Sequence, residues 1–502
     1  MTKRLLTTLS RTLLGAVTVI AVAACDSTPP PIRDGSLPPR PDTATETRPK
    51  GKGTARDASS KHAQRTPVEE LEAASDESLD LDRALELAEI SNPELRAARA
   101  VLAAATARET GAGLFPNPDL EVTMESASFG ENTTGDAEYI AGLVQDIPLG
   151  GRLGAGERVA AAQRHRAALR AVATRLRVRE NVRLAFFAAL HADETVRALE
   201  DRYAAAADGV RLAQALVDAG ESSPADVARA GVEEGRAGLA LDDARSLERN
   251  AREGLVTAIG LTGKEPDDVG GGVALEAHED WRLTGRLDEA LDLPRIQAAR
   301  DRLGRSPAIL EGAAAVREME ARVDLARSRR VPDVSLGAFY RRLEGESGHL
   351  KDAFDIGLAM PIPLFDSGRS GVAAAEAGLD EARHRAELVR STVLGRARTL
   401  VESLGQSLRT AVRYRDSIDP GAADVLESME ARYRAGDVSL ADVLPVRRER
   451  WDIRLAYLDA LRDVAVLYSR LRALTGGEGS DRELSRAAKS ALPAESTRRR
   501  ED

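Results

Sequence analysis

Four short segments of the chain alternate apolar and polar residues. In the clearest of them, Phe354, Ile356 and Leu358 alternate with Asp355 and Gly357. A period of two is typical of strands that have one apolar and one polar face. The pattern predicts strands over about 118–127, 137–147, 332–341 and 353–363.

Long segments with helical spacing follow each pair of predicted strands. Two of them, 151–218 and 367–434, run for 68 residues each, and only the second contains a proline, Pro420. A helix of this length spans on the order of 100 Å. Shorter helical patterns cover 84–114, 225–259, 298–330 and 441–474. Their alanine-rich composition favours coiled-coil packing, with two short helices stacked end to end along each long one.

The same order of elements occurs twice, at offsets of 213 to 216 residues. Five short motifs recur in order, which indicates a duplication rather than chance. The pairs are Asn92-Pro93-Glu94-Leu95 with Ser306-Pro307-Ala308-Ile309, Phe115-Pro116 with Val331-Pro332, Ile147-Pro148-Leu149 with Ile362-Pro363-Leu364, Ala219-Gly220 with Ala435-Gly436, and Leu261-Thr262-Gly263 with Leu474-Thr475-Gly476. We therefore expect a mainly α fold with a small β part, built from a duplicated unit of helix, β-hairpin, long helix and helix.

The turn after each long helix has the same pattern in both copies: Ala-Gly, two residues, Ser, two residues, Asp-Val. Glycine permits the left-handed backbone that often ends a helix. Serine suits the N-cap of the returning helix, and its first turn favours a carboxylate. The turns at 219–224 and 435–440 are therefore expected to be hairpin tips, and helix-start chemistry alone explains Asp226 and Asp442.

Composition divides the chain into five segments. Residues 26–80 are rich in proline, threonine and charge, so they bury too little apolar surface to fold. The expected order is a signal peptide at 1–24, a lipidated cysteine and disordered tether at 25–80, repeat 1 at 81–285, repeat 2 at 286–476 and a disordered tail at 477–502.

The only cysteine, Cys25, follows a basic start and a short apolar run, as in a secretory signal. It stands where lipoproteins carry their modified cysteine, so we expect Cys25 to bear acyl chains such as palmitate that anchor it in a membrane. An ordinary cleavage site with an incidental cysteine is the alternative. In enteric bacteria an aspartate after the lipidated cysteine favours the inner membrane, so Asp26 leaves the sorting open.

Charge and residue usage argue against several functions. The net charge of −10 gives no overall basic balance for binding nucleic acid. One cysteine and six scattered histidines form no metal-ligand motif, and no cofactor is expected. No nucleophile–base set appears either, so the chain is not expected to be an enzyme.

The glycine-rich stretch 150–156 follows a strand and opens a helix, as a phosphate-binding loop would. It fits neither of the common nucleotide-binding glycine motifs. A bend between strands and long helix is the better interpretation, because prolines end strand pairing. The expected bend residues are Pro148, Gly150, Gly151 and Pro363.

Four strands are too few to close a barrel, because even the smallest barrels use about eight. Either several chains contribute strands, or the four form a water-soluble sheet. Three chains with four strands each would supply twelve.

Together these motifs resemble the outer-membrane factor family of TolC-like channels, and more closely its CzcC-like branch of efflux lipoproteins. The resemblance covers about 81–476 and is carried by Asn92-Pro93-Glu94-Leu95, Leu114-Phe115-Pro116-Asn117-Pro118, Pro148-Leu149-Gly150-Gly151-Arg152, Ala219-Gly220 with Asp226-Val227, and Tyr433 and Gly436 with Asp442-Val443-Leu444. It implies a homotrimer with a 12-stranded β-barrel in the outer membrane of a Gram-negative bacterium and coiled-coil helices in the periplasm. It also implies a periplasmic adaptor (a membrane fusion protein) and an inner-membrane pump, which drives substrate that the channel conducts passively.

The resemblance also assigns roles at the hairpin tips. It implies that the adaptor docks at Gly220, Ser223, Asp226, Tyr433, Gly436 and Ser439. It makes Asp442 part of an acidic ring at the pore entrance, where three copies would attract cations. Pro445 stands where the family often has a second acidic residue, and Val438 where its best-known member has an arginine of the closed state. The resemblance therefore does not extend to a double ring or to that gating network.

Three functions stay open on the sequence. The leading one is the exit duct of a tripartite efflux system, and the CzcC-like motifs favour heavy-metal cations as its substrate. The second is an outer-membrane duct for drug or protein export. The third, of another class, is a lipid-anchored periplasmic coiled-coil scaffold.

Overall fold

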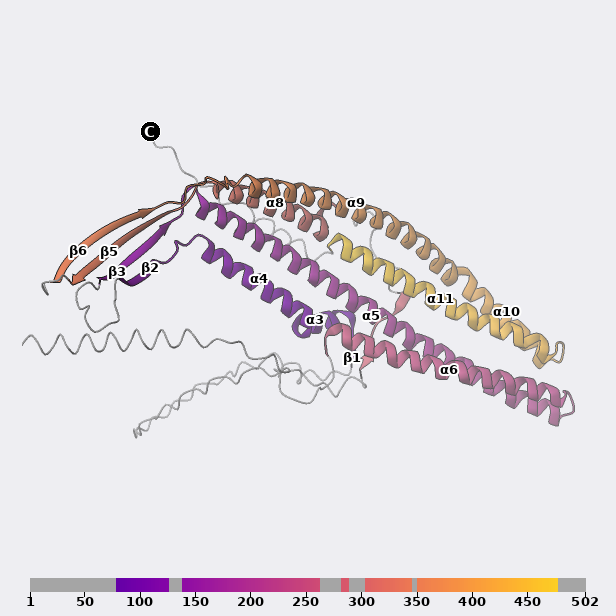
Figure 1. Cartoon of the computed structure of the whole chain (residues 1–502). Coiled ribbons are helices and arrows are strands. Elements are labelled where there is room, and N and C mark those ends of the chain that lie inside the picture. Colours follow the sequence, from indigo (N-terminus) through magenta and orange to yellow (C-terminus); the bar gives the residue numbers. More distant parts are fainter. Residues whose placement is uncertain (1–77, 126–137, 262–280, 289–302, 345–349, 477–502) are drawn as a thin grey trace, which may run out of the picture. The chain divides into compact units, whose positions relative to one another are not determined.

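The computed structural model describes residues 78–125, 138–261, 281–288, 303–344 and 350–476. The expected signal peptide, Cys25, most of the tether and the 477–502 tail lie outside the described residues. The described part is mainly helical, with few strands, as expected (Figure 1).

Four strands form one antiparallel sheet in the order β2-β3-β5-β6. Their bounds are β2 (Asp119–Glu125), β3 (Glu138–Ile147), β5 (Val334–Glu344) and β6 (Leu350–Ala359). Each repeat supplies one hairpin, and the pairing of β3 with β5 joins the two repeats. β6 ends before the expected position 363, because Pro361 and Pro363 have no N–H for pairing. β5 continues beyond the expected 341, since it stays paired as far as Glu344.

The first long helix is α-helical throughout, and the second is not. α5 (Arg152–Asp218) runs without a break. The second consists of α9 (Arg369–Arg413), the π-helical turn η3 (Tyr414–Ile418) and α10 (Asp419–Arg434). The helix expected over 367–434 is therefore present from Arg369 to Arg434 without a gap, but a π turn that was not expected interrupts its α-helical hydrogen bonds. Pro420 has no N–H, and its ring clashes with the carbonyl four residues earlier, which a wider π turn relieves.

The single helix expected over 84–114 is wrong, because the structure has two helices that are separated at Asn92. Asn92 lies between α3 (Leu81–Ser91) and α4 (Pro93–Ala112). Its Oδ1 accepts the N–H groups of Glu94 and Leu95 at 2.9 and 3.4 Å. Pro93 takes the first helical position, where a missing N–H costs nothing. The helix stops and restarts here without an unsatisfied end.

The same break is the joint between the short helices of repeat 1. Asn92 Nδ2 donates to the carbonyl of Ala258 at 3.1 Å, near the end of α6 (Pro224–Ile259). Ser91 Oγ donates to the carbonyl of Ile259 at 3.0 Å. Gly260, at φ 89°, lies so close that an added Cβ would be 2.7 Å from Cα of Asn92. α4 and α6 both pack along α5. The expected end-to-end stacking is therefore present.

Repeat 2 has the same plan. η2 (Leu303–Arg305) precedes α8 (Pro307–Ser328), and α8 and α11 (Leu440–Thr475) both pack along α9. The first part of the helix expected over 298–330 lies outside the described residues, and α8 begins at Pro307 after its N-cap Ser306. A parallel pair, β1 (Ser78–Leu79) with β4 (Arg282–Leu283), was not expected, because two-residue strands show no alternation.

The largest apolar cluster joins both repeats. α5 packs against α8 and α11 of repeat 2 as well as against its own repeat. The most deeply buried residues of this cluster include Phe186, Leu190, Leu255, Ile259, Leu458 and Leu461. The two copies therefore share a core. In the described part of the chain, every helix is too short or too polar to cross a membrane.

Candidate functional site

Both long helices end at a left-handed glycine. Gly220 has φ 77° and Gly436 has φ 80°. At the second tip the N–H of Asp437 donates to the carbonyl of Arg432 at 2.9 Å, and that of Gly436 to Tyr433 at 3.0 Å. This pair of bonds is the Schellman motif, and the first tip has the same two bonds. An added Cβ would meet no atom within 4 Å at either glycine, so the backbone angle alone requires glycine.

Each returning helix begins with a serine and an aspartate in a capping box. The N–H and hydroxyl of Ser439 donate to Oδ2 of Asp442 at 3.0 and 2.6 Å. Ser223 donates in the same way to Asp226, at 3.3 and 3.1 Å, and Ser222 adds a bond at 2.9 Å. The helix-start role expected for both aspartates is therefore present.

The two aspartates differ in exposure. The hydrogen bond from the Ser439 hydroxyl lowers the pKa of Asp442 below its ordinary value, and that from Ser222 does the same for the pKa of Asp226. Both carboxylates are therefore ionised at neutral pH. The Asp442 side chain is exposed, whereas that of Asp226 is 18% exposed and contacts Arg229 at 3.3 Å. Asp442 thus presents a free negative charge at the tip.

Tyr433 lies inside the tip rather than on its surface. Its side chain is 7% exposed and packs in an apolar cluster with Leu440 and Val443 of its own hairpin and Ala213 and Ala230 of the first. Burial raises the pKa of the Tyr433 hydroxyl, which has no hydrogen-bond partner within the described residues. Its ring holds the two hairpins together.

Ion pairs also join the hairpins, and the sequence did not predict them. The Arg448 guanidinium on α11 donates to both oxygens of Glu233 on α6, at 2.9 and 2.5 Å. Arg447 pairs with Glu430 across the second hairpin at 2.8 Å. Arg448 and Glu233 lie 215 positions apart in the sequence. Each has the pattern of a charged residue on a solvated helix face, so nothing in the sequence indicates that the two form a pair.

The expected bend residues lie where the strands meet the long helices. Pro148 directly follows the last paired residue of β3, and Gly150 and Gly151 have φ 64° and 72°. An added Cβ on Gly150 would lie 2.7 Å from the carbonyl oxygen of Ser328, so only glycine fits this approach. In repeat 2, Pro363 follows the end of β6.

The bend also connects the repeats. The N–H of Leu149 donates to Oδ1 of Asp333 at 3.2 Å, and Arg152 forms an ion pair with the same carboxylate. Gly368, at φ 70°, precedes α9 as Gly151 precedes α5. The residues around Gly368 differ from those around Gly151, yet both glycines adopt the same left-handed conformation before a long helix. The bend and the tip are separated by the whole of α5, about 100 Å of helix.

One face of the sheet is apolar and exposed. The register places Val122, Ala141, Tyr340 and Phe354 side by side across the four strands. Phe354 and Ile356 are each 84% exposed. The other exposed apolar residues of this face are Leu120, Met124, Tyr139, Leu143, Leu336 and Leu358. An exposed apolar surface of this extent marks a membrane or interaction face.

The opposite face of the sheet is polar. Arg341 bonds to Glu138 and to Asp355, each at 2.8 Å, and so links three neighbouring strands. The Phe339 ring lies against Gly142 and Gly337, where an added Cβ would collide with it. Within the described strands, β2 and β6 each pair on one side only, which leaves two open edges. The sheet is therefore incomplete in one chain.

The described residues contain no group of three or more His, Cys, Asp and Glu side chains that could hold a metal ion.

Paired β-hairpins joined to long helical hairpins, present twice in one chain, are the architecture of a TolC-like channel subunit. The chain belongs to the outer membrane efflux protein family, whose sequence profile matches residues 84–261 and 298–477. The family consists of channel proteins of the Gram-negative outer membrane, and the chain is such an efflux channel.

Individual relatives agree with this assignment. The chain is 29% identical over 404 residues to the cobalt-zinc-cadmium resistance protein CzcC of Cupriavidus metallidurans, over 79% of this chain and 89% of that protein. It is 28% identical to the nickel-cobalt-cadmium resistance protein NccC of Alcaligenes xylosoxydans xylosoxydans, over 60% and 65%. The crystal structure of the Campylobacter jejuni CmeC outer membrane channel has the same fold, with a TM-score of 0.64, 18% identity, and coverage of 82% and 89%.

Proposed function

We propose that three copies of the chain form the exit duct of a tripartite efflux system, with twelve strands in the outer membrane and the helices in the periplasm. The observation that carries the proposal is the four-stranded sheet, which has an exposed apolar face and two open edges. An open edge in lipid leaves backbone groups unsatisfied. Pairing β6 of one copy with β2 of the next removes every edge and gives a barrel above the minimum of about eight strands.

Assembly is tested on protein extracted from the outer membrane. A trimer should migrate as one species on a gel without heating and as a monomer after boiling. A water-soluble monomer after removal of Cys25 would support the periplasmic scaffold instead.

The hairpin tips are the proposed docking site for the periplasmic adaptor, and the inner-membrane pump supplies the energy. Gly220 and Gly436 shape the two turns through the same pair of backbone bonds. Ser223, Asp226 and Ser439 belong to the capping boxes that start the returning helices. Tyr433 contributes by holding the hairpins together. The exposed Asp442 supplies one charge of an acidic ring at the entrance, and a threefold ring attracts cations.

Cys25 is the proposed lipid anchor. The basic start, apolar run and lone cysteine of the N-terminal sequence support it. Labelling with radioactive palmitate tests it: the wild type should incorporate the label and Cys25→Ser should not. Label retained in Cys25→Ser would overturn the anchor without affecting the proposed duct.

Heavy-metal cations are the proposed substrate. Identity of 29% to a cobalt-zinc-cadmium resistance protein over most of both chains supports this choice, as does the acidic tip. A deletion strain should become sensitive to zinc, cobalt or cadmium, and the intact gene should restore resistance. Sensitivity to dyes or antibiotics alone would favour a drug duct, and a secretion defect alone would favour protein export.

A further inference from the structure

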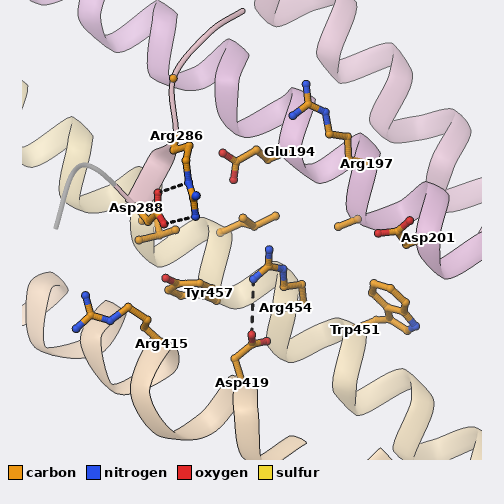
Figure 2. A pocket seen from close by; sticks show the side chains of 14 residues that line it. Glu194, Arg197, Asp201, Arg286, Asp288, Arg415, Asp419, Trp451, Arg454 and Tyr457 are labelled. Carbon is orange, nitrogen blue, oxygen red and sulfur yellow. Dashed lines mark hydrogen bonds and ion pairs between the residues drawn. The ribbon is translucent and has the colours of Figure 1, made fainter. Parts of the chain in front are cut away.

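A cavity of about 520 Å³ lies beside the π-helical turn (Figure 2). Its walls come from α5, α11, the start of α10 and the segment 285–288. Its volume lies within the range of about 300–1,000 Å³ that is typical of small-molecule sites. Its lining residues belong neither to the tips nor to the four-stranded sheet.

The α11 wall of the cavity is aromatic and apolar. It presents Trp451, Tyr457, Leu458 and Leu461. Arg454 already lies over the Tyr457 ring, 5.7 Å from its centroid. Trp451 is half-buried, and no described guanidinium stacks on it. Because the indole face attracts cations more strongly than other rings do, Trp451 offers an available surface for one.

Every arginine of the cavity is already bonded to a carboxylate. The pairs are Arg286 with Asp288 at 2.6 Å, Arg197 with Asp193 at 2.6 Å, Arg415 with Asp416 at 2.7 Å, and Arg454 with Asp419 at 3.6 Å. Figure 2 shows the first and last of these pairs on opposite sides of the cavity. An anionic ligand would have to compete with these carboxylates for the guanidinium groups.

Among the described residues that line the cavity, Glu194 and Asp201 are the two carboxylates without an ion-pair partner. The Glu194 carboxylate accepts one backbone bond, from the N–H of Leu287 at 3.3 Å, and no described arginine forms an ion pair with it. Burial raises the pKa of Glu194, and the nearby charges of Arg454 and Arg197 offset this only in part. Asp201 adds a second, exposed carboxylate on the same helix. Each arginine of the cavity thus has a carboxylate partner, whereas these two carboxylates have no ion pair and can accept a cation.

We propose that this cavity binds an organic cation, with the positive charge beside Glu194 and the apolar part against Trp451 and Leu461. A divalent metal ion fits less well, because no three His, Cys, Asp or Glu side chains of the described residues are placed so that they could hold one. A weakly hydrated quaternary ammonium group matches a single carboxylate next to an indole face. The site does not depend on which substrate the duct conducts.

The chain carries its own reporter for the test. It has two tryptophans, Trp281 and Trp451, so Trp281→Phe leaves only the indole of the cavity. Full-length trimer in detergent is titrated with tetrabutylammonium chloride, which does not absorb at the excitation wavelength. The emission of Trp451 should change and reach saturation. Glu194→Gln should weaken binding roughly tenfold, the value of one interaction with a charged group.

The matched control is Glu200→Gln. Glu200 is on the same helix and pairs with Arg245 outside the cavity, so its loss removes an equal charge and should leave the affinity unchanged. Should Glu194→Gln fail to form heat-modifiable trimers, the exposed Asp201→Asn replaces it and should also weaken binding. The proposal would be overturned if the titration did not saturate, or if Glu194→Gln (or Asp201→Asn in its place) bound tetrabutylammonium as tightly as the wild type. It would also be overturned if butanesulfonate bound as tightly as tetrabutylammonium. The sulfonate result would assign the cavity to an anion.

Discussion

Gly436 holds a backbone angle that other residues adopt only with strain. A β-branched residue there costs about 1–3 kcal/mol and disturbs the Schellman turn of the second tip. We expect Gly436→Val to form trimers but to reduce efflux, because the turn would no longer present the docking surface. Heat-modifiable trimers on gels and metal resistance of the complemented deletion strain measure the two effects.

Gly421→Val is the control for this prediction. Gly421 lies in α10, upstream of the same tip, without a positive φ and with no atom near an added Cβ. Its replacement should leave resistance intact. Full resistance with Gly436→Val would count against a docking role for the tip.

Asp442 makes a hydrogen bond that starts a helix and also carries an exposed charge. The equivalent aspartate of the first tip, Asp226, allows the two roles to be tested separately. Asp226 makes the same bonds but is largely covered. We expect Asp442→Ala to lower cation selectivity, read from reversal potentials across a planar bilayer, and Asp226→Ala to change it much less. Since the pKa of Asp442 is depressed, its charge and the selectivity should persist until the pH falls below about 3.8. Unchanged selectivity in Asp442→Ala would leave only the helix-start role.

Asn92 joins three helices through one side chain. It caps α4 and bonds to the end of α6 while ending α3. Asn92→Ala should lower the free energy of unfolding by about 1–3 kcal/mol, because it removes the cap and leaves buried groups unpaired. Urea unfolding followed by circular dichroism measures this. The exposed Asn250→Ala in α6 should change little, and equal effects of the two would contradict the role of the joint.

At the scale of elements, ion pairs fasten α8 of repeat 2 to α5 of repeat 1. Burial alone would raise the pKa of Glu311, but its bonds to Arg166 and Arg170, at 2.7 and 3.0 Å, outweigh this and hold the pKa below its ordinary value. A depressed acid pKa stabilises the fold above the unfolded pKa, and the effect is lost as the pH falls through the folded value. The contribution is therefore complete at pH 7 and is lost progressively as the pH falls below about 4.5, the ordinary pKa of glutamate.

Glu311→Gln tests this link. It should lower the melting temperature by about 1–2 °C at pH 7, and the difference from wild type should vanish near pH 3. The control is Glu320→Gln, an exposed residue of the same helix whose nearest arginine is 4.0 Å away. It should have no effect at either pH. A Glu311→Gln deficit that persists at low pH would point to packing instead of charge.

The elements were predictable wherever one local period governs many residues. Alternation located all four strands of the main sheet, and the duplicated turn located both tips. The breaks at Asn92 and near Pro420 were not predicted. The apolar residues on both sides of Pro93 and Pro420 keep the spacing of a helix, and a proline does not disturb that spacing. At Asn92 a side chain could end one helix and cap the next. At Pro420 the backbone widened into a π turn.

Parts of the site that depend on distant partners could not be predicted. Burial of Tyr433 needs alanines from the other hairpin, and the Arg448–Glu233 pair joins positions 215 residues apart. The cavity at Glu194 needs four separate segments. Each residue type is ordinary on a helix face, so local spacing carries no signal for these contacts.

At the scale of the whole molecule, a single chain leaves part of its surface unpaired and uncovered. Its helices share a buried core, but its sheet exposes apolar side chains and leaves β2 and β6 unpaired among the described strands. Three copies remove both deficits at once, since edges pair and the apolar face meets lipid. In the proposed duct, the same assembly would bring three Asp442 charges to one entrance.

Bilayer conductance of purified, heat-modifiable trimers tests this account most directly. The account predicts discrete steps of conductance after insertion, with a reversal potential that shows preference for cations. Boiled monomer should give no steps. Trimers that never insert or conduct, under conditions in which another outer-membrane channel does, would contradict it.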